Sequence, residues 1–297
     1  MIKVSNVSKN FDGFQALNSL NMDIGAGAVY GLVGPNGAGK STIIRHIVGI
    51  YRQDEGDITI EGERVYENPK IKSRIAYIPD DLFYFNSATI RDMMRFYQGI
   101  YPRFDYERFN KLRDIFDLDQ ARPMRRLSKG MQKQAAFWIA ISCRPDILVL
   151  DEPVDGLDPV MRRQIWGIVM GDVAEYGTTV LVSSHNLREL EDICDHVGIM
   201  NNGSILLERS LSELQENIVK IQVALPEGGK LPDNLEIVHE SQAGRLHTLI
   251  IRGDSAELSA RFESVSPLFF DLLPLTLEEI FIYELGGADY AVKDILL

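Results

Sequence analysis

Gly34-Pro35-Asn36-Gly37-Ala38-Gly39-Lys40-Ser41-Thr42 decides the fold of this chain, because these residues match the P-loop pattern at every fixed position. The apolar run Ala28–Val33 leads into the loop, and a helix is expected to start near Lys40. Glycines let successive backbone N–H groups turn towards phosphate oxygens, and the helix N-terminus presents its positive dipole end to the same oxygens. A strand, a glycine-rich loop and a helix in this order predict an ATP-binding site.

The side chains at the end of this loop have distinct expected tasks. Lys40 should reach the β- and γ-phosphates, and Ser41 should offer its hydroxyl to Mg²⁺. The expected nucleotide contacts of the loop are Gly34, Asn36, Gly37, Gly39, Lys40, Ser41 and Thr42. The alternative is a glycine-rich turn that binds nothing, and the flanking strand and helix argue against it.

An acidic pair, Asp151-Glu152, follows the unbroken apolar run Ile147–Leu150. An open parallel sheet binds its ligands at the carboxyl ends of its strands. We therefore expect Asp151 to belong to the Mg²⁺ shell, and Glu152, on the other side of the strand, to polarise an attacking water. The alternative is that the acidic pair only caps a helix.

The pattern of apolar runs predicts an α/β fold. Ile147–Leu150 and Thr179–Val182 are almost unbroken apolar runs, which fit strands covered on both faces and hence a parallel sheet. We expect residues 1–216 to form a P-loop core sheet with a helical subdomain at about 88–143. Residues 217–297, in which acidic residues outnumber basic ones, are expected to form a small C-terminal α+β domain.

Composition narrows the class of protein. The chain has 297 residues, 45% of them hydrophobic, and its formal net charge of -12 makes free nucleic acid and anionic membranes poor partners. Cys143 and Cys194 show no metal-type spacing and are expected to be buried thiols in a reducing compartment. The N-terminus lacks a signal-peptide pattern and no window is apolar enough to span a membrane. We therefore expect a cytoplasmic chain that reaches any membrane through a partner.

Further motifs resemble those of the ATP-binding cassette (ABC) ATPases. Leu127–Gln132 is similar to the signature motif of that family, and Gly156–Asp158 resembles its D-loop. Ser184-His185 resembles the switch histidine after the next strand, and Phe11 stands where the family places an adenine-stacking aromatic residue. The motifs stand in the family's order over residues 1–215. The ending Leu275–Phe281 is similar to the close of bacterial exporter-type subunits.

The resemblance implies a two-fold pair of ATPase subunits, homodimeric or heterodimeric, with ATP held between the P-loop of one chain and the signature of the other. Ser128 and the Gly130 amide would contact the γ-phosphate across that interface, and Asp158 would belong to the same nucleotide site. His185 would contact the γ-phosphate and orient Glu152, although a lone histidine is more often structural. Phe11 would stack on adenine, and the alternative is that Phe11 belongs to the core.

Two positions depart from the family pattern. Lys129 replaces the first of two usual signature glycines, which adds charge there. Asp80 follows the apolar strand pattern Ile75–Ile78 where the family usually has a glutamine that contacts Mg²⁺ and water. A carboxylate also binds Mg²⁺, so we expect Asp80 to be a metal ligand, with its catalytic role open.

The region around the signature is basic, with Arg125, Arg126, Lys129 and Lys133 close together. Such a cluster is also typical of nucleic-acid binding, but no aromatic residues interleave these four. We expect the cluster to counter triphosphate charge or to pair with neighbouring acids.

The run Leu82-Phe83-Tyr84-Phe85 is apolar and aromatic but falls in an expected loop. Loops are normally exposed, so the run predicts a partner surface, and the family docks its membrane subunit beside this loop. The alternative is that these rings pack on the helices at about 88–117.

The sequence therefore predicts the ATP-hydrolysing subunit of an ABC transporter. The ending Leu275–Phe281 favours an exporter. It would lie on the inner face of the cell membrane through polytopic membrane subunits. One alternative is a soluble ABC ATPase acting on ribosomes or DNA. Against that alternative, the chain has one cassette and no long coiled coil between the P-loop and the signature. Another alternative is a regulatory sensor that binds ATP without turnover, because Asp80 stands where the family usually has a glutamine.

Overall fold

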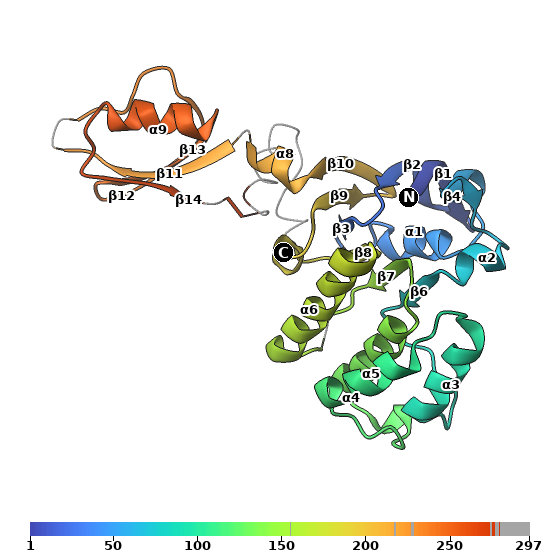
Figure 1. The fold of residues 1–297 in the computed structure, drawn as a ribbon. Coiled ribbons are helices and arrows are strands. Elements are labelled where there is room, and N and C mark those ends of the chain that lie inside the picture. The colour runs from blue at the N-terminus through green and yellow to red at the C-terminus, as the bar shows by residue number, and fades with distance from the viewer. Residues whose placement is uncertain (155, 217, 227–228, 274, 277–278, 280–297) are drawn as a thin grey trace. The chain divides into compact units, whose positions relative to one another are not determined.

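A computed structural model describes the chain except for residues 155, 217, 227–228, 274, 277–278 and 280–297 (Figure 1). The chain divides into two compact units. They are Met1–His185 with Ile193–Glu208, and Asn186–Asp192 with Arg209–Leu297. The expected functional boundary between residues 216 and 217 stays a prediction.

The first unit is built around a six-stranded sheet (Figure 1). In spatial order its strands are β10 (Ser204–Ser210), β9 (His196–Asn201), β3 (Val29–Val33), β8 (Thr179–Ser184), β7 (Ile147–Asp151) and β6 (Ile75–Ile78). The neighbours from β9 to β6 pair in parallel. Every residue of β3, β7 and β8 is buried, which explains their almost continuous apolar runs. The predicted α/β fold with a P-loop core sheet is confirmed.

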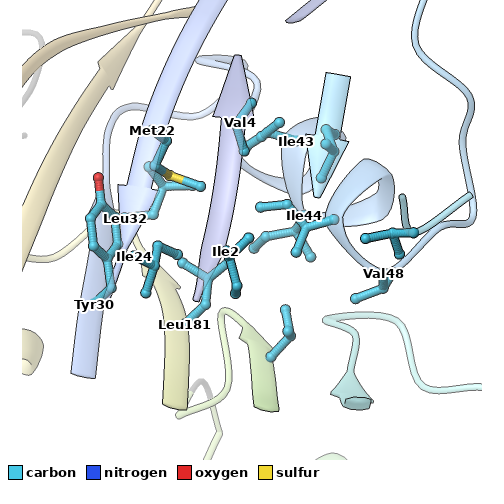
Figure 2. Packing of buried hydrophobic residues seen from close by; sticks show 14 of the residues in the cluster. Ile2, Val4, Met22, Ile24, Tyr30, Leu32, Ile43, Ile44, Val48 and Leu181 are labelled. Carbon is cyan, nitrogen blue, oxygen red and sulfur yellow. The ribbon is translucent and has the colours of Figure 1, made fainter. Parts of the chain in front are cut away.

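A second, antiparallel sheet holds the N-terminus of the chain. Its order is β2 (Phe14–Ile24), β1 (Ile2–Phe11), β4 (Glu55–Ile60) and β5 (Glu63–Arg64). The helix after the P-loop, α1 (Lys40–Ile47), shares one core with this sheet. Figure 2 shows Ile2 and Val4 of β1 beside Ile43 and Ile44 of α1, all of them buried. This apolar contact fixes the position of α1, whose first residues are the last residues of the P-loop.

The expected helical subdomain consists of α3 (Ile90–Ile100), α4 (Tyr106–Phe116), the short 3₁₀ helix η1 (Met124–Arg126) and α5 (Lys129–Ser142). Thr89 and Asp92 form a capping box at the start of α3. The rings of Phe109 in α4 and Trp138 in α5 stack with centroids 4.3 Å apart, and the Trp138 indole donates to the Phe109 carbonyl. This stacked pair fixes α5, which carries the signature residues at its N-terminus.

The shorter elements of the chain are α2 (Pro69–Lys72), α7 (Arg188–Glu191) and α8 (Leu211–Glu216). The longest helix in the part of the chain that the structure describes is α6 (Pro159–Tyr176), which follows the D-loop. Arg108 of α4 and Asp172 of α6 form an ion pair of 2.7 Å, which ties the helical subdomain to the core. Cys143 and Cys194 are buried free thiols. Within the described residues, no helix is both long and apolar enough to cross a membrane.

Among its described residues, the second unit contains an antiparallel sheet and a helix, α9, that packs on it. The sheet order is β12 (Glu236–Ala243), β13 (Leu246–Arg252), β11 (Ile218–Ala224) and β14 (Phe269–Leu273). Leu258 and Phe262 of α9 (Ser255–Glu263) close a core with Ile221 and Leu249. This part of the chain is α+β, as its turn-rich sequence predicts. Of the closing segment Leu275–Phe281, residues 277, 278, 280 and 281 lie outside the described residues.

Candidate functional site

The P-loop lies between β3 and α1 and rests on distant parts of the chain. A Cβ at Gly34 would lie 2.2 Å from the Met200 carbonyl oxygen, and one at Gly39 would lie 2.8 Å from the Ala16 carbonyl oxygen. Gly37 and Gly39 also have φ of 84° and 106°, a region that favours glycine. The loop therefore needs glycine both for its backbone angles and for its close contact with β9 and β2.

Lys40 closes this loop on itself. Its side chain is buried, and its ammonium donates to the Gly34 carbonyl at 2.6 Å and to the Pro35 carbonyl at 3.3 Å. The same ammonium lies 3.3 Å from Oε1 of Glu152. Because a P-loop lysine binds phosphate with this ammonium, the contacts mark the place that phosphate oxygens would take.

Asp151 gathers hydroxyl groups at the end of β7. Its Oδ1 accepts hydrogen bonds from Ser41 at 3.1 Å and from Ser183 at 2.7 Å. Ser183 belongs to the neighbouring strand β8, where it pairs in register with Asp151. A carboxylate and two hydroxyls form an all-oxygen donor set, which is the set that Mg²⁺ prefers. The residues therefore fit a magnesium ion, and the metal roles expected of Ser41 and Asp151 stay predictions.

Glu152 is held at every polar group that it has. Its N–H donates to Ser183 at 3.1 Å, and its carbonyl accepts from the Lys133 ammonium at 2.7 Å. Its carboxylate meets Lys40 through Oε1 and Nδ1 of His185 through Oε2, the latter at 2.9 Å. The backbone of Glu152 has φ of 46°, a left-handed conformation that costs a non-glycine residue on the order of 1 kcal/mol or more. These contacts hold the carboxylate of Glu152 in one place despite that cost.

His185 directly follows β8, and its side chain is nearly half exposed. Its backbone N–H also donates to Oε2 of Glu152, at 3.3 Å. Strand ends β7 and β8 and the P-loop thus bring Lys40, Ser41, Asp151, Glu152 and His185 into one connected set of contacts. The set can bind an anion beside a metal and hold one carboxylate for proton transfer.

The signature and the D-loop touch each other. Ser128 caps α5, where its Oγ accepts from the Met131 N–H at 3.3 Å. A Cβ on Gly130 would lie 2.4 Å from the Gly156 carbonyl oxygen, so the D-loop admits only glycine there. Asp158 caps α6 by accepting from the N–H groups of Val160 and Met161. The nucleotide contacts expected of Ser128, Gly130 and Asp158 stay predictions.

Phe11 ends β1 as a partly exposed ring. Its edge meets Tyr51 with ring centroids 5.6 Å apart, and the Lys9 ammonium lies 5.4 Å from its centroid. Tyr51, which follows α1, has no sequence motif that could have identified it. Phe11 is therefore a supported surface ring, which is compatible with stacking on a planar base.

Asp80 follows β6 and is exposed. Its Oδ1 lies 3.4 Å from the Lys133 ammonium. After it come the exposed rings of Phe83, 72% accessible, and Phe85, 45% accessible, with Phe85 in edge contact with Phe96 of α3. Phe83 is thus not part of the core, and Phe85 contacts the helical subdomain with only part of its surface.

An apolar groove of about 350 Å³ opens beside this loop. The residues that line it include Ile50, Tyr77, Leu82, Phe83, Met93, Phe96 and Ile139. Tyr77 of β6 lines this groove, and burial and then the Asp151 carboxylate raise the pKa of Tyr77 to about 12.

Sequence reasoning missed several residues of this site. Met200 and Ala16 shape the P-loop through their backbone carbonyls and, at Gly39, through the Met200 side chain, and no motif records these contacts. Ser183 could have been found, because it occupies the same strand end as His185. Lys133 was expected to counter charge, but its burial and its bond to Glu152 depend on tertiary structure.

The family model described as ABC transporter matches residues 17–155. The chain is 32% identical over 290 residues to the ABC transporter ATP-binding protein YtrB of Bacillus subtilis (strain 168), covering 97% of this chain and 99% of that protein. It is 32% identical over 226 residues to the daunorubicin/doxorubicin resistance ATP-binding protein DrrA of Streptomyces peucetius, covering 73% of this chain and 67% of that protein.

A solved structure, the ATP binding subunit of an ABC transporter, matches with a TM-score of 0.68 and 26% identity. The match covers 72% of this chain and 92% of that one.

Proposed function

Because the chain belongs to the ABC transporter ATP-binding proteins and is an ATPase, we propose that it drives a transporter by closing as a pair around ATP and Mg²⁺. The observation that carries this proposal is the set of contacts around Glu152. Lys40, His185 and Lys133 hold Glu152 beside the place that the γ-phosphate would take. Such a fixed carboxylate suits hydrolysis better than sensing alone.

Each residue of the site has a proposed task. Gly34, Asn36, Gly37, Gly39 and Thr42 supply the backbone cradle, and Lys40 pairs with phosphate charge. Ser41 and Asp151 hold Mg²⁺, which would supply charge neutralisation on the phosphates. Glu152 accepts the proton of the attacking water, and His185 keeps Glu152 oriented. Ser183 belongs to the same group, because it supports both Asp151 and Glu152.

Two chains would complete each site. Ser128 caps α5 as an exposed residue, and the first turn of this helix contains the Gly130 amide. A helix N-terminus of this kind binds anions readily, so the γ-phosphate of a second chain is its proposed partner. Asp158 lies two residues after Gly156, the D-loop residue next to Gly130, and would belong to the same interface.

The membrane partner is proposed to dock in the apolar groove beside Phe83. Exposed aromatic residues around a concave apolar surface are typical of interfaces. The name of DrrA includes drug resistance, which favours export as the direction of transport. The chain would then work on the inner face of the membrane through polytopic subunits, as a homodimer or a heterodimer.

Co-purification tests this assignment directly. The chain would be co-expressed with a polytopic membrane protein encoded beside its gene, and both would be isolated in detergent through a tag on that protein. Recovery of the chain with ATPase activity stimulated by the membrane protein supports the transporter proposal. An active ATPase that binds no such protein contradicts it.

Replacing Phe11 with alanine should raise the KM for ATP by about tenfold, because stacking on one base contributes about 1–3 kcal/mol. The kcat should stay within about twofold, since Phe11 does not touch the reacting phosphate. Phe14→Ala is the matched control, because Phe14 is an exposed ring that faces Phe11 across the β1–β2 hairpin. The assignment is wrong if Phe14→Ala raises the KM and Phe11→Ala does not.

Replacing Asp80 with asparagine should shift the Mg²⁺ concentration for half-maximal ATPase activity upward by about tenfold if Asp80 joins the metal shell. Nucleotide affinity, measured by fluorescence of a labelled ATP, should change much less. A carboxylate has two oxygens, so contact of Oδ1 with Lys133 is compatible with a metal role for the group. An unchanged Mg²⁺ titration contradicts metal binding by Asp80.

A further inference from the structure

Lys133 is the one lysine besides Lys40 among the buried polar residues of the described chain, and neither the P-loop nor the signature assigns it a task. It lies in the second turn of α5, on the same helix that Ser128 caps. Its side chain is 7% exposed. A buried ammonium is costly unless it is paired and hydrogen-bonded, so its partners indicate what it is there to hold.

The first partner is the backbone of Glu152. The Lys133 ammonium donates to the Glu152 carbonyl at 2.7 Å, a shorter distance than those from Glu152 to Ser183, Lys40 and His185. This carbonyl belongs to a residue in the left-handed region, with φ of 46°. Such a conformation persists only where its surroundings fix it. The bond from Lys133 fixes the backbone on one side, and the bond to Ser183 fixes it on the other.

The second partner is Asp80, at 3.4 Å from the same ammonium. Asp80 begins the loop that carries Phe83 and Phe85. A second contact joins this loop to α5, because Gln132 donates to the Tyr84 hydroxyl at 3.4 Å. A polar cavity of about 430 Å³ lies here and includes Asp80, Tyr84, Gln132 and Lys133 in its lining. The loop after β6 is therefore tied to Glu152 through one ammonium group.

We propose that Lys133 is a positioning residue that holds the Glu152 carboxylate for hydrolysis and transmits the state of the Asp80 loop to it. The proposal rests on the proposed role of Glu152 in hydrolysis. Lys133 would not touch the reacting atoms itself. It sets the Glu152 backbone, and Asp80 determines how firmly the ammonium stays on that carbonyl. A shift of the loop that moved Asp80 would loosen Glu152 without any change in the P-loop.

The test compares Lys133→Met, Lys133→Arg and Lys133→Gln in the full chain, with Lys111→Met as the control. Methionine keeps the apolar stem but removes the donor, arginine keeps a charged donor, and glutamine keeps a neutral one. Lys111 is an exposed lysine on α4. Each variant is measured for kcat and KM with ATP and Mg²⁺, for affinity to fluorescent ATP, and for thermal unfolding.

Lys133→Met should lower kcat by about 100-fold, because a catalytic group displaced by about 1 Å loses about that factor. Affinity for fluorescent ATP should stay within about threefold, since the phosphate cradle is intact. Lys133→Arg should recover most of kcat, Lys133→Gln part of it, and Lys111→Met should match the wild type. The proposal is wrong if folded Lys133→Met has the kcat of the wild type. It is also wrong if Lys133→Arg is as slow as Lys133→Met, or if Lys133→Met loses ATP affinity by the same factor as kcat.

A double-mutant cycle with Asp80→Asn tests the second half of the proposal. If Asp80 acts through Lys133, the effect of Asp80→Asn on kcat disappears in the Lys133→Met background. Full additivity of the two effects overturns the transmission role. If the proposed role of Glu152 in hydrolysis is wrong, Glu152→Gln will hydrolyse ATP normally. If only the proposed role of Lys133 is wrong, Glu152→Gln will be inactive and Lys133→Met will be active.

Discussion

Glu152→Gln is expected to lower ATP hydrolysis by about 100-fold or more, because general-base catalysis contributes about 10²–10⁴ to a rate. Glutamine has nearly the same shape and keeps an oxygen that can accept from His185. It loses the negative charge that lies 3.3 Å from the Lys40 ammonium. Removal of that charge frees Lys40 for phosphate and lowers repulsion of the triphosphate. Affinity for ATP should therefore be equal to that of the wild type or higher.

The same substitution should trap a pair of chains with ATP between them, since closure no longer leads to hydrolysis. Light scattering with ATP and Mg²⁺ should give the mass of a dimer for Glu152→Gln and of a smaller species for the wild type after turnover. Glu107→Gln, at an exposed acid of α4, serves as the control and should hydrolyse ATP normally. Normal turnover in Glu152→Gln contradicts the assignment of Glu152, and a monomer with bound ATP contradicts the paired mechanism.

Replacing both Phe83 and Phe85 with serine should abolish binding of the chain to its membrane subunit. Burial of two such rings in a partner contributes on the order of a few kcal/mol, and its loss weakens binding by about 100-fold or more. Phe83 is 72% exposed and Phe85 is 45% exposed, so most of the Phe83 surface and nearly half of the Phe85 surface are accessible in the free chain. Basal ATPase activity and Tm should therefore change little, with a small loss of stability from the Phe85–Phe96 contact.

Detergent pull-down and stimulation of ATPase activity by the membrane subunit measure this effect. Tyr106→Ser, at another exposed ring of the helical subdomain, is the matched control and should bind normally. A double variant that loses several kcal/mol of stability would show that the two rings belong to a core after all. A stable double variant that still binds the membrane subunit would place the docking surface elsewhere.

The main features of the fold could be predicted because they follow from local rules. The P-loop requires a strand before it and a helix after it, and the unbroken apolar run at Ile147–Leu150 requires a strand covered on both faces. The pairing order of β1, β2 and β4 could not be predicted in this way. Their register depends on how Ile2 and Val4 meet α1, which is a contact between distant segments.

The residues of the candidate site also fall into those that local rules predict and those that depend on tertiary contacts. Asp151, Glu152 and His185 could be located, since parallel strands deliver their ends to one edge of the sheet. The left-handed backbone of Glu152 could not, because glutamate has no intrinsic preference for it and only its neighbours fix it. The sequence indicates only that Lys133 counters triphosphate charge or pairs with neighbouring acids, and its burial and its bond to the Glu152 carbonyl depend on tertiary structure.

The contacts behind the P-loop have a consequence for genetics. The Met200 carbonyl and the Ala16 carbonyl fill the space next to Gly34 and Gly39, so small shifts of β9 or β2 displace the phosphate cradle. Alleles that change residue 16 or 200 are then expected to resemble P-loop alleles in phenotype, although they lie far from the motif in the sequence. The set of positions at which substitution abolishes ATP binding is therefore expected to include residues 16 and 200.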